Sequence, residues 1–89
     1  MFRLWAKEFK DNHMIKDIVI ANNSPCMTRT KKIFAAIENI CQEFDLSNPI
    51  WLDSTIEDFK RFDKTRFTQD NFIDSIDFDY LEIHVIEED

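Results

Sequence analysis

The chain has 89 residues, of which 44% are hydrophobic, and its formal net charge is −7. A chain of this length forms a single domain, here residues 1–89, and nine Phe with two Trp supply enough apolar surface for a core. Glycine is absent. This excludes phosphate-cradling loops, dinucleotide-binding fingerprints, EF-hands and nucleophile elbows, because each of these motifs needs glycine at a tight turn.

The first two predicted elements are strands. Residues 2–9 alternate between two sets of side chains, and a period of two is typical of a strand. Residues 14–21 are rich in β-branched side chains, which also favours a strand. The two segments predict a hairpin with a turn at residues 10–13, where Asp and Asn must adopt the conformations that glycine usually takes.

A helix is predicted next, over residues 28–44. Its apolar side chains fall on one face: Ile33, Phe34, Ile37, Ile40, Cys41 and Phe44. Thr28 and Thr30 are candidate caps, but a start at Ser24-Pro25 is favoured. An early start moves the bases Arg29, Lys31 and Lys32 away from the positive end of the helix dipole. If the helix starts later, we expect these bases to contact an anion.

Two further helices are predicted in the second half. Ser54 and Glu57 have the spacing of a capping box and predict a short helix that buries Ile56 and Phe59. Residues 65–68 are either a brief strand or a connector. Thr68 then caps a third helix, on which three apolar side chains share a face: Phe72, Ile73 and Ile76.

Residues 78–86 alternate again and predict a strand paired with the N-terminal hairpin. Leu81, Ile83 and Val85 lie on one side of it, opposite Tyr80, Glu82 and His84. The order is therefore β-β-α-α-α-β. We expect an α+β fold, in which the hairpin and the C-terminal strand form a small antiparallel-rich sheet with helices packed on one face.

The negative charge is concentrated in the second half of the chain. Residues 1–42 carry a net charge of +3, and residues 43–89 carry −10. On the third predicted helix, Asp70, Asp74 and Asp77 share one face. Together with Asp79 and Glu82 they form a candidate surface for a protein partner that is basic, although a solvated face that binds nothing is the simpler interpretation. The negative electrostatic field of residues 43–89 disfavours direct contact with nucleic acid.

No catalytic site, metal site or cofactor is predicted. The carboxylates at residues 74–82 are hard ligands, but no tight loop brings them together. His13 and His84 do not belong to a Cys/His cluster. His84 is either a cross-strand partner or a tuned acid–base group, and a nucleophilic pair between a histidine and Cys26 or Cys41 stays open. Cys41 lies on the apolar helix face, which favours a core position.

The N-terminus lacks the apolar segment of a signal peptide, and no segment has the roughly 20 apolar residues that span a bilayer. With two cysteines in reduced form, these features predict a cytoplasmic protein without membrane contact.

Four stretches carry a resemblance: RLWAK (3–7), PIWLDS (49–54), KTRFTQDNFI (64–73) and FDYLEIHVIEED (78–89). Through them the chain resembles a group of small acidic bacterial proteins with no assigned activity. The resemblance implies a free-standing cytoplasmic protein and transfers no catalytic or binding residue.

These features predict a non-enzymatic protein-interaction module, of which self-association is one form. Trp5 and Trp51 are expected to stay partly exposed. The alternative is an acidic mimic of nucleic acid that occupies the basic groove of a DNA- or RNA-binding enzyme. A metal- or histidine-dependent enzyme is the third hypothesis.

Overall fold

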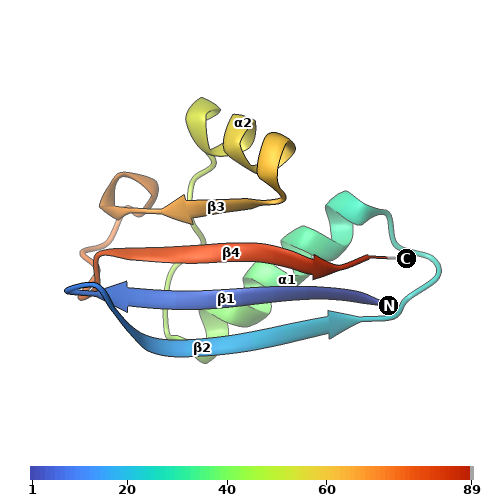
Figure 1. Cartoon of the computed structure of the whole chain (residues 1–89), viewed down its shortest axis with the longest axis horizontal. Coiled ribbons are helices and arrows are strands. Elements are labelled where there is room, and N and C mark those ends of the chain that lie inside the picture. The colour runs from blue at the N-terminus through green and yellow to red at the C-terminus, as the bar shows by residue number, and fades with distance from the viewer. Residues whose placement is uncertain (89) are drawn as a thin grey trace.

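The computed structural model describes residues 1–88, and these form a four-stranded antiparallel sheet, two α-helices and a short 3-10 turn. The α+β class is therefore confirmed. The elements are β1 (Phe2–Lys10), β2 (His13–Asn22), α1 (Arg29–Glu43), α2 (Asp53–Phe62), β3 (Lys64–Phe67), η1 (Gln69–Asn71) and β4 (Tyr80–Glu87). The strands lie side by side in the order β2-β1-β4-β3 (Figure 1).

The predicted hairpin is confirmed, and the C-terminal strand pairs with it as expected. β1 pairs with β2 on one side and with β4 on the other. The turn residues Asp11 and Asn12 have φ values of 52° and 66°, in the left-handed region that favours glycine. The backbone N–H of Asp11 donates a hydrogen bond of 2.9 Å to Oδ2 of Asp79, which ties the turn to the chain that enters β4.

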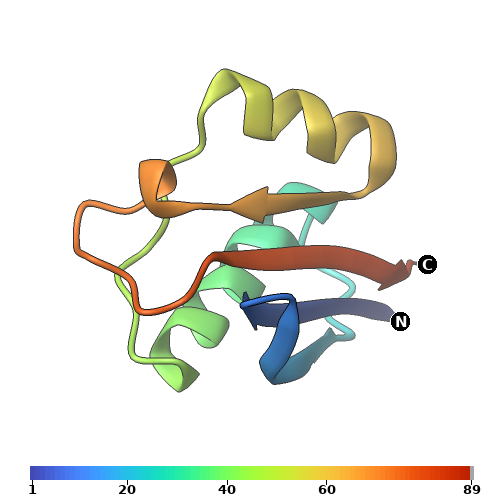
Figure 2. The same cartoon turned by 60° about the vertical axis from the view of Figure 1, so that its left-hand side comes forward.

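The sheet has one covered face and one open face. α1 runs behind the strands in both views, and α2 lies beside the β3 edge (Figure 1, Figure 2). Side chains that alternate along β1 and β4 point to the covered face and are buried: Phe2, Leu4, Ala6, Leu81, Ile83 and Val85. The helices and β3 add Ile33, Ile37, Ile40, Cys41, Phe59 and Phe67 to the same core. Burial of these apolar side chains is the main driving force for the fold.

The third predicted helix is wrong, because residues 68–79 contain only the three-residue η1 followed by irregular chain. Side chains bind backbone groups there and replace the helical hydrogen bonds. Gln69 accepts a hydrogen bond from the N–H of Ile76 at 2.9 Å and donates one to the carbonyl of Asp74 at 2.8 Å. Phe72 is buried while Ile73 is 84% exposed, so the two do not share a face.

Both helices start elsewhere than was favoured, and for α1 the alternative cap Thr28 is confirmed. α1 begins at Arg29, and Oγ1 of its cap Thr28 accepts a hydrogen bond from the N–H of Lys31 at 3.3 Å, so the favoured start at Ser24-Pro25 is wrong. α2 begins at Asp53 with Leu52 before it, so Ser54 lies inside the helix and does not cap it. Residues 65–68 were left open between strand and connector, and the strand β3 forms there over Lys64–Phe67.

Candidate functional site

Asn71 fixes the segment that joins α1 to α2. It is buried, and its side-chain amide donates hydrogen bonds to the carbonyl of Ile50 at 2.8 Å and to Oγ1 of Thr55 at 3.1 Å. The N–H of Ile50 donates back to the carbonyl of Asn71 at 2.6 Å. These bonds tie both the connecting segment and the first turn of α2 to η1. Trp51, the next residue after Ile50, is positioned by them.

Trp51 lies edge-on against three phenylalanine rings. The ring centroids are 5.1 Å from Phe67, 5.6 Å from Phe59 and 6.1 Å from Phe34, all in the perpendicular arrangement that aromatic pairs favour. Phe59 and Phe67 are core residues, whereas Phe34 is 52% exposed. The aromatic cluster therefore runs from the core out to the surface. The sequence placed Phe34 on the buried stripe of its helix, but it lies at the edge of that stripe.

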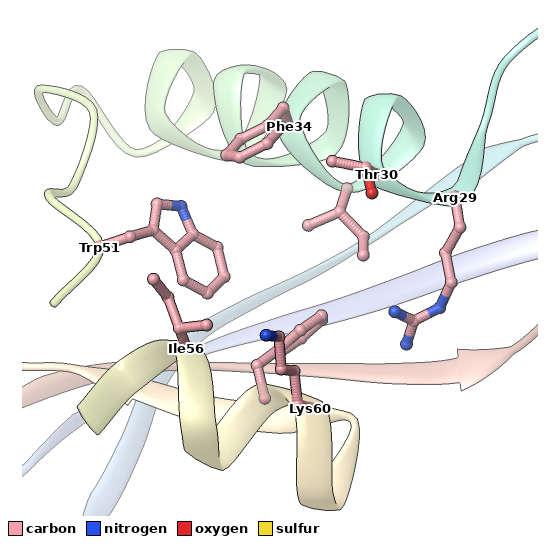
Figure 3. A pocket seen from close by; sticks show the side chains of 8 residues that line it. Arg29, Thr30, Phe34, Trp51, Ile56 and Lys60 are labelled. Carbon is pink, nitrogen blue, oxygen red and sulfur yellow. The ribbon is translucent and has the colours of Figure 1, made fainter. Parts of the chain in front are cut away.

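The rings border a cleft of about 320 Å³ between the two helices, here called the α1–α2 cleft (Figure 3). Its apolar walls are Ile33, Phe34, Trp51, Ile56 and Phe59. Figure 3 shows Phe34 on α1 across the opening from Ile56 and Lys60 on α2, with Trp51 at one end and Arg29 at the other. Of the described residues that line this cleft, none carries a negative charge.

The cationic rim already binds carboxylates of the chain itself. Arg29 pairs with Asp63, with 2.7 Å between Nη2 and Oδ1, and its Nε donates to Oε1 of Glu88. The bases at the start of α1 were expected to contact an anion if the helix began late, and for Arg29 these two side chains supply it. Within residues 1–88, Lys60 forms no ion pair. Lys31 is exposed and Lys32 is buried, and neither lines the α1–α2 cleft.

The helix face that was predicted to align Asp70, Asp74 and Asp77 does not form. Asp70 lies in η1, and Asp74 and Asp77 lie in the irregular segment after it, all three exposed. Asp79 binds the hairpin turn, and Glu82 lies in β4. The regular helical spacing that would align them is lost, because residues 72–79 are not helical.

Glu82 belongs to a network on the open face of the sheet. Its carboxylate lies 3.0 Å from Nζ of Lys7 and 3.2 Å from Nε of Arg66, and its side chain is 13% exposed. Burial alone raises the pKa of Glu82, but the hydrogen bonds and charges of Lys7 and Arg66 outweigh it, so this pKa lies below its usual value. Lys7 also lies over the ring of Trp5, and Arg66 over that of Tyr80. The central charged side chains of this face therefore already form ion pairs, Lys7 and Arg66 each with Glu82.

The sheet separates His84 from Cys41. His84 lies on the open face, between Trp5 and Lys64 on the neighbouring strands. Cys41 is buried on the covered side, as predicted, and burial raises the pKa of its thiol to about 11. A nucleophilic pair of Cys41 with His84 is therefore wrong. Cys26 is exposed in the loop before α1.

Within residues 1–88, no group of three or more His, Cys, Asp or Glu side chains is placed to hold a metal ion. Neither helix in this part of the chain has the length and apolar character needed to cross a membrane. In comparisons with protein-family models, with curated proteins and with solved structures, the chain matches none.

Proposed function

We propose that the protein is a non-enzymatic interaction module, and that its α1–α2 cleft binds a segment of a partner protein that carries apolar and acidic side chains. The observation that carries this proposal is the cleft itself, about 320 Å³ with aromatic and aliphatic walls and a cationic rim. Concave apolar sites with a few placed charges are the usual form of a binding pocket.

The walls support an apolar anchor on the partner. Phe34 exposes half of its surface, and Trp51 is only partly buried. Keeping such rings in water is unfavourable, and covering them with a leucine or phenylalanine side chain would recover that free energy. Aromatic side chains in a preformed pocket are also typical of the residues that dominate binding at protein interfaces. Because Asn71 holds Trp51 in place, little ordering would be needed on binding.

The rim supports an acidic flank next to that anchor. Arg29 already pairs with Asp63 and Glu88, so a partner carboxylate would have to exchange with one of them at this end of the α1–α2 cleft. Lys60 lies on the same rim, and a partner carboxylate would give it an ion pair. This differs from the basic partner that the sequence suggested, which stays a hypothesis for the acidic residues at positions 70–77. The mimicry of nucleic acid has less support, because those residues are not aligned on a helix.

A selection experiment tests this proposal. A library of random 12-residue peptides would be displayed and selected against the immobilised protein, without choosing a partner in advance. We expect the enriched peptides to combine a large apolar residue with Asp or Glu, and to bind the folded protein in solution. Enrichment of basic peptides, or of none, would contradict the proposal.

Variants then locate the site. Phe34→Ala should weaken peptide binding by about tenfold or more, which corresponds to one anchoring aromatic contact. Phe62→Ala is the matched control, because Phe62 is 55% exposed on α2 but does not line the α1–α2 cleft, and it should leave binding unchanged. Lys60→Glu should weaken binding through charge alone. If Phe34→Ala binds as well as the wild type, the peptide occupies another surface.

Two outcomes would replace the partner protein by another occupant. A dimer that Phe34→Ala converts to monomer would make the α1–α2 cleft an interface between two copies. Tight binding of a fatty acid such as dodecanoate, with no peptide enriched, would make it a small-molecule site. Sedimentation and calorimetry on the same variants separate these results from the proposed one.

A further inference from the structure

A second cleft, of about 340 Å³, lies near the turn of the β1–β2 hairpin, and is here called the corner cleft. It shares no lining residue with the α1–α2 cleft. Its walls come from β1, β2, the end of α1 and the segment before β4. Five of the lining side chains are apolar: Ile15, Phe44, Leu46, Ile76 and Phe78. Three others are acidic: Glu8, Asp45 and Asp77.

Glu8 is the unusual member of this set. It follows Leu4 and Ala6 on the covered face and is only 3% exposed. Among the hydrogen bonds and ion pairs of residues 1–88, none involves its carboxyl group, and its oxygens are not sealed in the core but open to the corner cleft. Lys16 lies opposite it on β2, yet Nζ of Lys16 lies over the ring of Phe44, 5.8 Å from the centroid. A largely buried carboxylate is unfavourable unless a donor or a positive charge reaches it, and in native proteins such groups usually have a partner.

The surroundings of Glu8 would favour a bound cation. Burial raises the pKa of Glu8, Lys16 lowers it, and the negative charge of Asp77 raises it again, with a net increase. The carboxylate form is therefore held at a cost, and a positive charge beside it would relieve that cost. The apolar walls would contact the hydrocarbon chain of an organic cation, whereas a bare ion has no such surface to bury. The phenylalanine rings can in addition form a cation–π contact with the positive charge.

We propose that the corner cleft binds an alkylammonium group, with its ammonium beside Glu8 and Asp77 and its alkyl chain between Phe44 and Phe78. A free linear amine and the lysine side chain of another protein both supply this chemistry. Lys16 is a competing cation at the edge of the corner cleft, and we expect it to move toward solvent when the ligand enters. This proposal is independent of the α1–α2 cleft and does not need a partner there.

The test uses two probes, n-butylammonium and N-acetyl-lysine methylamide, titrated into the isotope-labelled protein. Methyl signals of Ile15 and Ile76 report on the corner cleft in NMR spectra. We expect saturable shifts of these signals with at least one probe. Binding of both with similar affinity indicates a site for free amines, and a clear preference for the blocked lysine indicates a protein side chain. Failure of both probes would overturn the proposal.

The variants separate binding from structure. Glu8→Gln keeps the shape of the side chain and should weaken binding by about tenfold, the scale of one charged contact. Asp77→Asn should weaken it less. Lys16→Met removes the competing charge and should tighten binding, which a purely structural role of Glu8 would not predict. Asp74→Asn is the control, because Asp74 lies in the same segment but does not line the corner cleft.

Two results would contradict the inference. Methyl shifts that persist in Glu8→Gln would place the amine elsewhere on the acidic surface. A Glu8→Gln protein that is more stable and binds the probes as tightly as the wild type would show that the buried carboxyl group takes no part in binding.

Discussion

Glu82 and Glu87 are both on β4 and both form ion pairs, but their surroundings differ. The side chain of Glu82 is 13% exposed and lies between two cations, whereas Glu87 is 48% exposed and pairs with Arg3 at 3.2 Å. Exposed pairs contribute little to stability because water and salt screen them, and partly buried pairs with good hydrogen bonds contribute more. The two residues therefore form a matched test of burial.

Glu82→Gln should lower the free energy of unfolding by about 1 kcal/mol at pH 7, and Glu87→Gln by about 0.3 kcal/mol or less. The pKa of Glu82 is lowered in the folded state from an ordinary value of 4.5. Its contribution is therefore present above pH 4.5 and is lost as the pH falls through the folded-state pKa. Urea unfolding at pH 7 and at about pH 3 measures both effects. Equal losses for the two variants, or a loss for Glu82→Gln that persists in acid, would contradict this explanation.

The two cysteines should differ sharply in reactivity. Cys26 is exposed, whereas Cys41 is buried and has a pKa of about 11, so its thiolate is scarce at pH 8. We expect iodoacetamide to modify the native protein once, at Cys26. The Cys26→Ser variant should react only after unfolding, as read by mass spectrometry. Rapid modification of native Cys26→Ser would show that the core around Cys41 opens readily.

At the scale of elements, the local sequence pattern was sufficient to predict a strand or helix wherever one face of that element is buried. The alternation in residues 2–9 and 78–86 predicted β1, β4 and their buried faces, because the covered face of the sheet imposes a period of two. The stripe on residues 33–41 predicted α1 for the same reason. The start of α1 was wrong because the dipole argument could not foresee that Asp63 and Glu88 neutralise Arg29 from distant positions.

The third predicted helix and most of the candidate site depend on contacts that no local pattern shows. Asn71 reads as an ordinary helix position, yet it holds Ile50 and Thr55 through hydrogen bonds across 21 and 16 residues. Partial exposure of Trp51 was predicted, but not its place in the α1–α2 cleft, since that place depends on Asn71. The sequence pattern also did not predict that Glu8 is buried, because its burial depends on the segment before β4.

Asn71→Ala tests this account of the connecting segment. The change leaves the carbonyl of Ile50 and the hydroxyl of Thr55 without their donor, and the N–H of Thr68 without its acceptor. We expect the free energy of unfolding to fall by about 2–3 kcal/mol, because unpaired buried polar groups are costly. Asn48→Ala, at an exposed position before Pro49, is the control and should change stability by less than about 0.5 kcal/mol. Similar values for the two variants would show that Asn71 does not position the segment.

At the scale of the whole molecule, folding mixes the two oppositely charged halves of the sequence. Arg29 from the basic half meets Asp63 and Glu88 from the acidic half, and Lys7 meets Glu82. What remains is the positive charge of Lys60 on the rim of the α1–α2 cleft and an acidic lining in the corner cleft. The two clefts therefore carry charges of opposite sign, and we expect them to bind different ligands.

The central claim is that an apolar and acidic peptide enters the α1–α2 cleft, and Trp51 can report this directly. In the Trp5→Phe variant, Trp51 is the one remaining tryptophan of the chain. Titration with a peptide from the selection should shift its fluorescence emission to shorter wavelength, with saturation, as the ring is covered. The same titration on a Trp5→Phe, Phe34→Ala double variant should give a much weaker response. An emission spectrum that does not change while the peptide binds would contradict the claim, since the peptide would then occupy a surface away from Trp51.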